Sequence, residues 1–265
     1  MMATIALVLI VFAAITQAAF LLRRENRRDP VSHWLLLAAA ALLTATLVDR
    51  SALIRFPAVT NTYESLLFFS GAVCVVLFAL RLARRTRGFS PFVTFGSTVL
   101  ALALLLIALY APQKVVPREI QPPIPALQSY WLVLHVVFSF IGEAFFLVSF
   151  VAAIAVLVSG TEERRAEMDH LVAASIGIGY PLFTAGALVF GAIWAETAWG
   201  AWWSWDPKET WALVTWLIYT AYLHTRLVKR LRGRVSAVLA LAGFAATVFT
   251  FFGVNYLLAG LHSYG

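Results

Sequence analysis

Eight long apolar runs divide the 265-residue chain, and each is long enough to cross a membrane. A helix needs about 20 apolar residues to span the hydrocarbon core of a bilayer. With 62% hydrophobic and 12% charged residues, the chain holds more apolar surface than a soluble core of this size buries. The sequence therefore predicts an all-α polytopic integral membrane protein, a single membrane domain over residues 1–265. Its eight predicted transmembrane helices cover roughly residues 3–22, 31–48, 63–82, 92–110, 129–158, 171–194, 209–228 and 236–259.

Positive charge is concentrated in alternate loops between these runs. Fifteen of the twenty Lys and Arg residues follow the first, third, fifth or seventh run. The positive-inside rule places those loops in the cytoplasm and both termini outside. The net charge of +7 is therefore a topology signal, and no nucleic-acid partner is expected. Because Arg23 and Arg24 follow the first run instead of preceding it, we expect a retained helix and not a signal peptide.

Several kinds of chemistry are excluded by the residues that the sequence lacks. The single cysteine, Cys74, excludes an internal disulfide and a Cys-rich metal site. There is no CxxCH motif, so the chain does not carry a covalently attached c-type heme itself. Phosphate-binding glycine motifs, nucleophile elbows and zinc-spaced Cys/His sets are also absent.

Tryptophan is crowded into one part of the chain, around a predicted external loop at residues 195–208. Seven of the nine tryptophans fall within one short window: Trp194, Trp199, Trp202, Trp203, Trp205, Trp211 and Trp216. One interpretation is an interfacial aromatic belt, since Trp favours the headgroup level. The other is a platform for a large flat hydrophobic ligand, because indoles offer broad faces at low entropic cost. Composition alone leaves both open.

Two histidines are predicted to reach the same outer face as the Trp-rich loop. His135 lies near the outer end of the fifth run, and His262 follows the outer end of the eighth. Neutral imidazole is a common axial ligand of heme iron. Each histidine alone is more simply an interfacial polar residue. Their convergence with the tryptophans predicts a bis-histidine heme site.

The remaining histidines have different surroundings. His224 is fifteen residues beyond Glu209, about 22 Å deeper along a straight helix, toward the cytoplasmic side. It is either a polar residue at a helix end or an axial ligand of a second heme inside the membrane. Its partner imidazole would then be His33 or a residue of another subunit. His170 stands among acidic residues and reads as solvated surface.

Three acidic residues near the outer side also need a role. Asp206 before Pro207 is typical of a helix N-cap, and Glu209 suits the positive end of that helix. Glu143 lies eight residues after His135 inside an apolar run. A carboxylate in a membrane is costly and often functional, so an ion pair or polar network is expected there.

The stretch 199–211, WGAWWSWDPKETW, closely resembles the WWD signature of heme-handling membrane proteins. The stretches 60–66, 125–131, 222–226 and 260–265 are similar to the CcsA/ResC branch of that family, part of the two-component cytochrome c synthase. The resemblance covers most of the chain. One departure is Trp202, where many relatives have Tyr, and an aromatic face is retained there.

The resemblance implies a function and a site. It implies that His135 and His262 ligate the iron of heme b above the WWD surface, and that His224 belongs to a lower, transmembrane heme site. The platform residues implied are Trp199, Trp202, Trp203, Trp205, Asp206 and Trp211. The chain would be an inner-membrane subunit that acts with a CcsB/ResB-like partner. Ferrous heme would then be joined by thioether bonds to the reduced thiols of a CxxCH apocytochrome c at the outer face.

Three other functions compete with this one. A CcmC-like protein would pass heme to a chaperone without ligating it to a cytochrome, and His224 and the tail 260–265 count against this. A HemX-like regulatory protein would lack synthase activity, and the full Trp-rich motif counts against it. A b-type electron-transfer subunit would carry two histidines on one helix, which no predicted helix here does.

Overall fold

The computed structural model describes residues 1–23, 29–83 and 90–258, and all regular structure in these ranges is helical. The predicted all-α fold is therefore confirmed. Each of the eight predicted apolar runs corresponds to a long helix. Two of these long helices contain a π-helical segment. The elements are α1 (Met2–Leu22), α2 (Ser32–Ile54), α3 (Thr62–Ala83), α4 (Pro91–Tyr110), η1 (Pro125–Leu127), α5 (Tyr130–Val158), α6 (Glu162–Phe183), η2 (Thr184–Phe190), α7 (Gly191–Trp199), α8 (Pro207–Leu227), η3 (Lys229–Leu231), α9 (Arg234–Val248), η4 (Phe249–Gly253) and α10 (Val254–Leu257).

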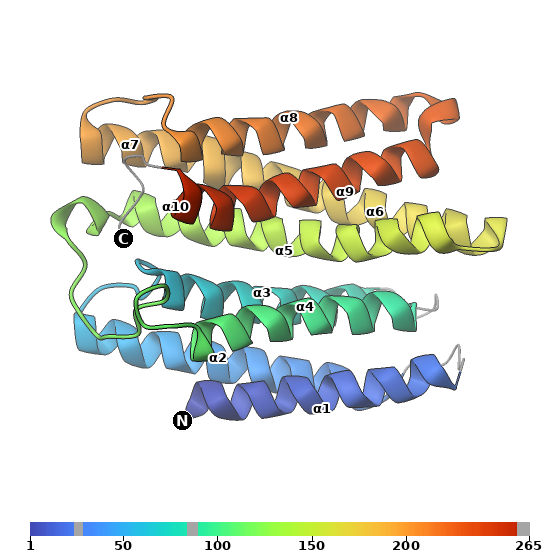
Figure 1. Ribbon diagram of the computed structural model, residues 1–265, viewed down its shortest axis with the longest axis horizontal. Coiled ribbons are helices and arrows are strands. Elements are labelled where there is room, and N and C mark those ends of the chain that lie inside the picture. Colours follow the sequence, from blue (N-terminus) through green and yellow to red (C-terminus); the bar gives the residue numbers. More distant parts are fainter. Residues whose placement is uncertain (24–28, 84–89, 259–265) are drawn as a thin grey trace. The chain divides into compact units, whose positions relative to one another are not determined.

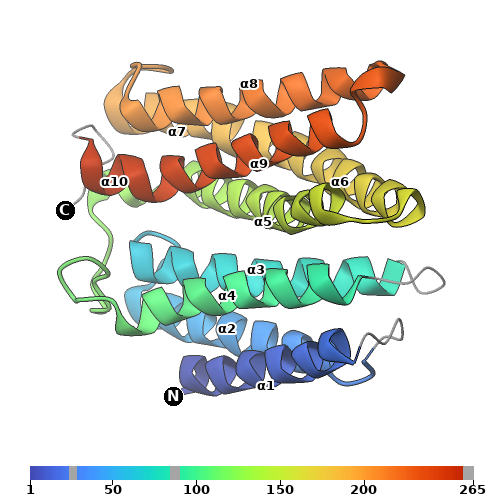
Figure 2. The same cartoon turned by 45° about the vertical axis from the view of Figure 1, so that its right-hand side comes forward.

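The chain divides into two compact units, Met1–Pro125 and Ala126–Gly265. In the first unit α1, α2, α3 and α4 run side by side, and α4 also packs against α1, which closes a four-helix bundle (Figures 1 and 2). Its core is built from small and branched apolar side chains such as Ala6, Leu36 and Leu66, which are almost fully buried. Such residues allow helices in a bilayer to approach closely.

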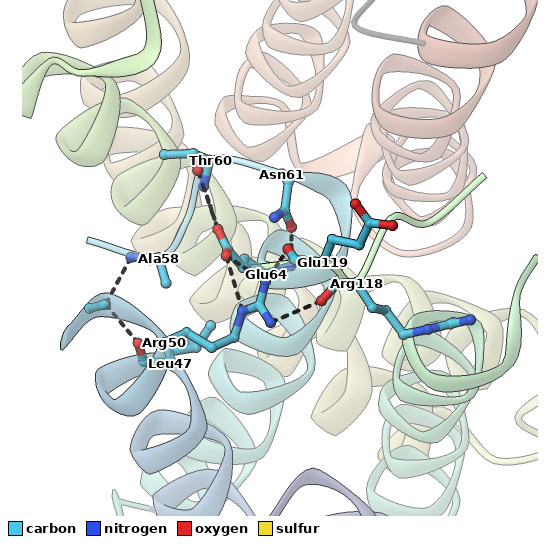
Figure 3. A network of polar contacts seen from close by, with 9 residues as sticks. Leu47, Arg50, Ala58, Thr60, Asn61, Glu64, Arg118 and Glu119 are labelled. Carbon is cyan, nitrogen blue, oxygen red and sulfur yellow. Dashed lines mark hydrogen bonds and ion pairs between the residues drawn. The ribbon is translucent and has the colours of Figure 1, made fainter. Parts of the chain in front are cut away.

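A buried ion pair anchors the connections at one end of this first unit (Figure 3). Arg50 on α2 donates from Nε to Glu64 Oε1 on α3 at 3.1 Å, and Glu64 is only 1% exposed. The same guanidinium donates to the carbonyl oxygens of Arg118 and Glu119 at 3.1 and 3.0 Å. Glu64 Oε2 accepts from the backbone N–H of Thr60 at 3.0 Å. One charge pair therefore fixes both the α2–α3 connection and the loop that follows α4.

A second buried ion pair lies between α3 and the residue segment that precedes α2. Arg81 Nη1 donates to Asp29 Oδ2 at 3.1 Å and to Ser32 Oγ at 2.7 Å. Burial raises the pKa of Asp29, but the hydrogen bonds from Ser32 and the charge of Arg81 outweigh it and hold that pKa below its ordinary value. Asp29 therefore stays ionised and paired at neutral pH.

In the second unit α5 is the central helix and contacts α6, η2, α7 and α9 (Figures 1 and 2). α8 packs against α9, α6 and η2. Two helices of this unit contain π-helical segments: α6 continues through η2 into α7, and α9 continues through η4 into α10. Pro181, which has no N–H to donate, stands three residues before η2 and weakens the regular helix there.

Seven helices in the described ranges are long and apolar enough to cross a membrane. The eighth long helix, α8, matches the predicted run 209–228 in position but falls outside this set. Its many Trp, Tyr and Thr residues make it less apolar than the others. Two boundaries differ from those predicted. The sixth helix begins at Glu162, so His170 lies on a helix and not in a loop, and the irregular part of the Trp-rich segment is shortened to residues 200–206.

Candidate functional site

The Trp-rich segment is a short loop between α7 and α8 in which two indole side chains are exposed. α7 ends at Trp199 because Gly200 adopts a left-handed conformation (φ 73°), which glycine allows without strain. Trp202 and Trp205 are 60% and 69% exposed. Trp203 is half-buried and packs edge-to-face on Trp205, with ring centroids 5.8 Å apart. The loop therefore offers a broad aromatic surface.

Glu209 holds this loop in shape. Its Oε2 accepts hydrogen bonds from the Ser204 N–H at 2.8 Å, the Ser204 hydroxyl at 3.1 Å and the Asp206 N–H at 3.3 Å. Between those two amides Trp205 has φ 57°, a left-handed conformation that costs a non-glycine residue about 1–2 kcal/mol. The Thr210 hydroxyl donates to the Trp205 carbonyl at 3.2 Å. Hydrogen bonds to Glu209 and Thr210 thus fix the backbone that carries the exposed indole of Trp205.

Asp206 begins α8 as the sequence predicts. Its side chain accepts from the Lys208 N–H at 2.9 Å, Pro207 occupies the first helical position, and Glu209 completes a capping box. Lys208 donates from Nζ to Asn255 Oδ1 on α10 at 3.1 Å. Glu143, buried on α5, lies within electrostatic range of the Lys208 charge. Glu143 Oε2 has no hydrogen-bond partner among the described residues, so the ion pair or polar network expected at Glu143 stays a prediction.

Trp194 and Trp199 form the buried support beneath the loop. Trp194 is 2% exposed, donates from Nε1 to the Ala126 carbonyl at 3.0 Å and packs in a cluster with Leu127 and Leu132. Trp199 packs edge-to-face on Trp194 with centroids 5.8 Å apart. Trp194 therefore belongs to the core of this unit, and the partly buried Trp199 packs against that core.

His135 is held by η2 and Trp194. Its Nδ1 lies 2.9 Å from the carbonyl oxygen of Gly186, and its ring stacks on Trp194 with centroids 6.1 Å apart and planes 17° from parallel. Because a carbonyl only accepts, Nδ1 carries the proton and Nε2 carries the lone pair. An imidazole with Nδ1–H on a carbonyl and Nε2 as the basic nitrogen is the form in which histidine ligates metals.

Of the other candidate ligands, the structure describes His224 and His33. His224 is exposed on α8, and its Nδ1 is 2.8 Å from the Thr220 carbonyl of its own helix, which again makes Nε2 the basic nitrogen. His33 belongs to the other unit, where its ring stacks on Phe78 with centroids 6.0 Å apart. His262 lies outside the residues that the structure describes. The structure therefore brings His135 together with Trp194 and leaves the pairing with His262 a prediction.

The remaining tryptophans of α8 both contact the π-helical segments. Trp211 packs on Phe249, the first residue of η4, with centroids 4.3 Å apart. Trp216 donates from Nε1 to the hydroxyl of Thr184, the first residue of η2, at 3.0 Å. Sequence reasoning missed both π segments and the role of Glu209. Pro181 followed by Gly186 and Gly191 inside an apolar run was the available signal for η2.

The donors and surfaces of this site fit a flat amphipathic macrocycle that contains iron. Exposed indoles supply apolar faces, and His135 supplies an imidazole in the ligating tautomer. The buried indole Nε1 atoms of Trp199 and Trp203 have no hydrogen-bond partner among the described residues. A buried donor without a partner is uncommon in a protein. The exposed indoles and the imidazole are the groups that a heme needs for its faces and its iron.

The chain matches known proteins over most of its length. The family described as cytochrome C assembly protein matches residues 59–262. The cytochrome c biogenesis protein CcsA of Chlamydomonas reinhardtii is 40% identical over 223 residues, 80% of this chain and 61% of that protein. CcsA of Prochlorococcus marinus is 36% identical over 287 residues, 89% of this chain and 88% of that protein.

One solved structure has a similar fold. The cytochrome c heme lyase CcmF superposes with a TM-score of 0.65 at 18% identity, over 98% of this chain and 46% of CcmF. At this level of identity the likeness concerns the fold alone. The chain therefore spans less than half of the CcmF chain and about three fifths of the algal CcsA protein.

Proposed function

Because this chain belongs to the cytochrome c assembly protein family and is related to CcsA proteins, we propose that it holds heme at the outer membrane face for cytochrome c assembly. The observation that carries the proposal is the state of His135. Its Nδ1–H is bound to the Gly186 carbonyl, so in the neutral ring the lone pair is on Nε2, the nitrogen that would ligate iron. A hydrogen bond of this kind orients the ring of a metal-ligating histidine.

The proposed platform combines the exposed indoles with two imidazoles. Trp202 and Trp205 would lie against the porphyrin faces, and burial of apolar surface contributes roughly 25 cal/mol per Å². His135 and His262 would occupy the axial positions of the iron. Trp199, Trp203 and Trp211 support this surface from α7, the loop and α8, and Asp206 fixes where α8 begins.

In the proposed reaction heme is the cargo, and it supplies the vinyl groups that form thioethers with the two thiols of a CxxCH apocytochrome c. The chain's own contribution is binding and orientation. The imidazoles fix the iron, and the rigid loop fixes the plane of the macrocycle so that one edge faces the arriving peptide. Holding the reactants in one geometry lowers the entropic part of the barrier.

His224 supports a second part of the proposal, a partner subunit of the CcsB/ResB type. His224 is exposed in the last turn of α8, two residues before Arg226, where a subunit packed against this helix could reach its ring. Its Nδ1–H is bound within its own helix, which again makes Nε2 the ligating nitrogen. An imidazole from a partner subunit would complete a lower heme site in the inner membrane, from which heme reaches the outer face.

Co-expression with a CcsB-like protein tests both parts of the proposal. The purified complex should show the absorption bands of six-coordinate heme. His224→Ala should remove the heme that the partner adds, and His135→Gly should abolish assembly of a reporter cytochrome c. Added imidazole should restore part of that assembly, because it refills the vacant axial position. Full assembly by a variant with Ala at both His135 and His262 would contradict the outer site.

A further inference from the structure

We propose that η2 and the glycine after it, Gly191, position the imidazole of His135 and fix which of its nitrogens is protonated. This inference rests on the proposed function, because the position of the ring matters there as that of an iron ligand. It assigns a role to three groups outside the Trp-rich loop: the Gly186 carbonyl, the bare Cα of Gly191 and the face of Trp194.

The Gly186 carbonyl is available to His135 because of the π-helical geometry. In a π-helix a carbonyl accepts from the N–H five residues later, and here Gly186 O accepts from Gly191 N–H. A carbonyl oxygen has two lone pairs, and the second accepts the Nδ1–H of His135 at 2.9 Å. The π-helical turn thus provides an acceptor whose position is fixed by backbone hydrogen bonding.

The absence of a side chain at Gly186 allows this contact. A Cβ built there would lie 2.3 Å from the backbone nitrogen of Ser139 and 2.8 Å from the carbonyl carbon of Phe138. The backbone of α5 therefore lies directly against η2. Ser139 is one helical turn beyond His135 on the same face, so the approach that excludes a side chain at Gly186 also brings its carbonyl to the imidazole.

Gly191 lies against another side of the His135 imidazole. A Cβ on Gly191 would lie 3.0 Å from His135 Nδ1 and 3.3 Å from its Cε1, tighter than ordinary van der Waals contact. Trp194, one turn along the same helix, stacks on the ring. The imidazole is therefore located by a carbonyl, by a glycine and by an aromatic face, all on one continuous helix.

The Gly191→Ala substitution tests this inference with little risk to the fold. Gly191 has φ −62° and ψ −46°, which alanine adopts without strain and favours in a helix. Its new methyl group displaces the ring and lengthens the bond to Gly186. Loss of a second-shell partner typically weakens metal binding about 10- to 100-fold, so heme affinity in the complex should fall by that factor. Gly177→Ala on α6 is the matched control, since a Cβ there meets nothing within 4 Å.

Two further measurements separate positioning from general damage. In the heme-free protein, ¹⁵N spectra of labelled histidine should show His135 as the Nδ1–H tautomer, and Gly191→Ala should shift that signal while Gly177→Ala does not. In a His135→Gly background supplied with imidazole, Gly191→Ala should cause no further loss of heme, because free imidazole is not tied to α5.

Each part of the test has an outcome that decides against it. Heme affinity of the Gly191→Ala variant equal to that of the Gly177→Ala variant would overturn the positioning role. So would a loss that persists in the double variant with imidazole. Unchanged heme content in His135→Gly would instead overturn the proposed heme site, while the heme-free ¹⁵N spectra would still decide whether η2 sets the tautomer.

Discussion

Replacing Glu209 with Ala should weaken heme binding although Glu209 is not among the residues proposed to contact heme. In the wild-type loop, Glu209 Oε2 accepts from the backbone amides on both sides of Trp205. Trp205 has φ 57° and costs about 1–2 kcal/mol in this left-handed state. Each backbone hydrogen bond contributes about 0.5–1.5 kcal/mol, so the two together offset that cost.

Without Glu209 the loop loses the two hydrogen bonds that offset the cost of the left-handed conformation. Trp205 then relaxes to an ordinary backbone conformation. A difference of 1–2 kcal/mol lowers the population of the native loop by a factor of roughly 5–30. Only the native loop presents Trp202 and Trp205 together, and the apparent dissociation constant rises by the inverse of that population. Heme affinity should therefore fall by about 5- to 30-fold.

Titration of heme into the detergent-purified complex, followed by absorbance, measures this change directly. Glu209→Gln keeps an accepting oxygen and should retain most of the affinity. Glu196→Ala removes a carboxylate from α7 without touching these hydrogen bonds and is the control for charge. Equal affinities for Glu209→Ala and wild type would refute the reasoning, as would an equal loss in Glu209→Gln and Glu209→Ala.

Three other predictions concern the scaffold. Glu64→Ala leaves Arg50 buried without its carboxylate and should cost about 3–5 kcal/mol, seen as a lower thermal midpoint in detergent. The depressed pKa of Asp29 means that its stabilisation is complete above about pH 4, the pKa of an unperturbed Asp, and is lost as pH falls through the lower folded-state pKa. Asp29→Asn should therefore lower stability at neutral pH and flatten the acid dependence of stability below about pH 4. Reporter fusions at Gly88 and Gly265 should lie on opposite sides, cytoplasmic and external, and the same side for both would refute the topology.

Helix positions followed from the sequence because apolar runs of membrane length have few other solutions. The start of α8 also followed, since Asp206 and Pro207 are local signals whose geometry needs no tertiary context. His135 could be singled out by its place at a helix end. Its tautomer could not, because the Gly186 carbonyl is 51 residues away along the chain.

Hydrophobic periodicity could not reveal the π-helical segments, and only Pro181 with Gly186 and Gly191 pointed to η2. An apolar run that is buried or faces lipid on all sides has no amphipathic period, so one extra residue in a turn does not change that period. The left-handed conformation of Trp205 was hidden as well, since it is held by three hydrogen bonds to Glu209 that form only when the loop folds back on α8. The shortened loop 200–206 reflects the same packing.

The absorption spectrum of the reduced complex, with His135→Gly compared against wild type, tests the central claim most directly. Wild type should show the sharp bands of low-spin, bis-histidine heme. His135→Gly should show a five-coordinate spectrum or loss of the outer heme, and added imidazole should restore the low-spin bands. An unchanged low-spin spectrum for His135→Gly without imidazole would show that His135 does not ligate the iron, and that heme is held elsewhere in the protein.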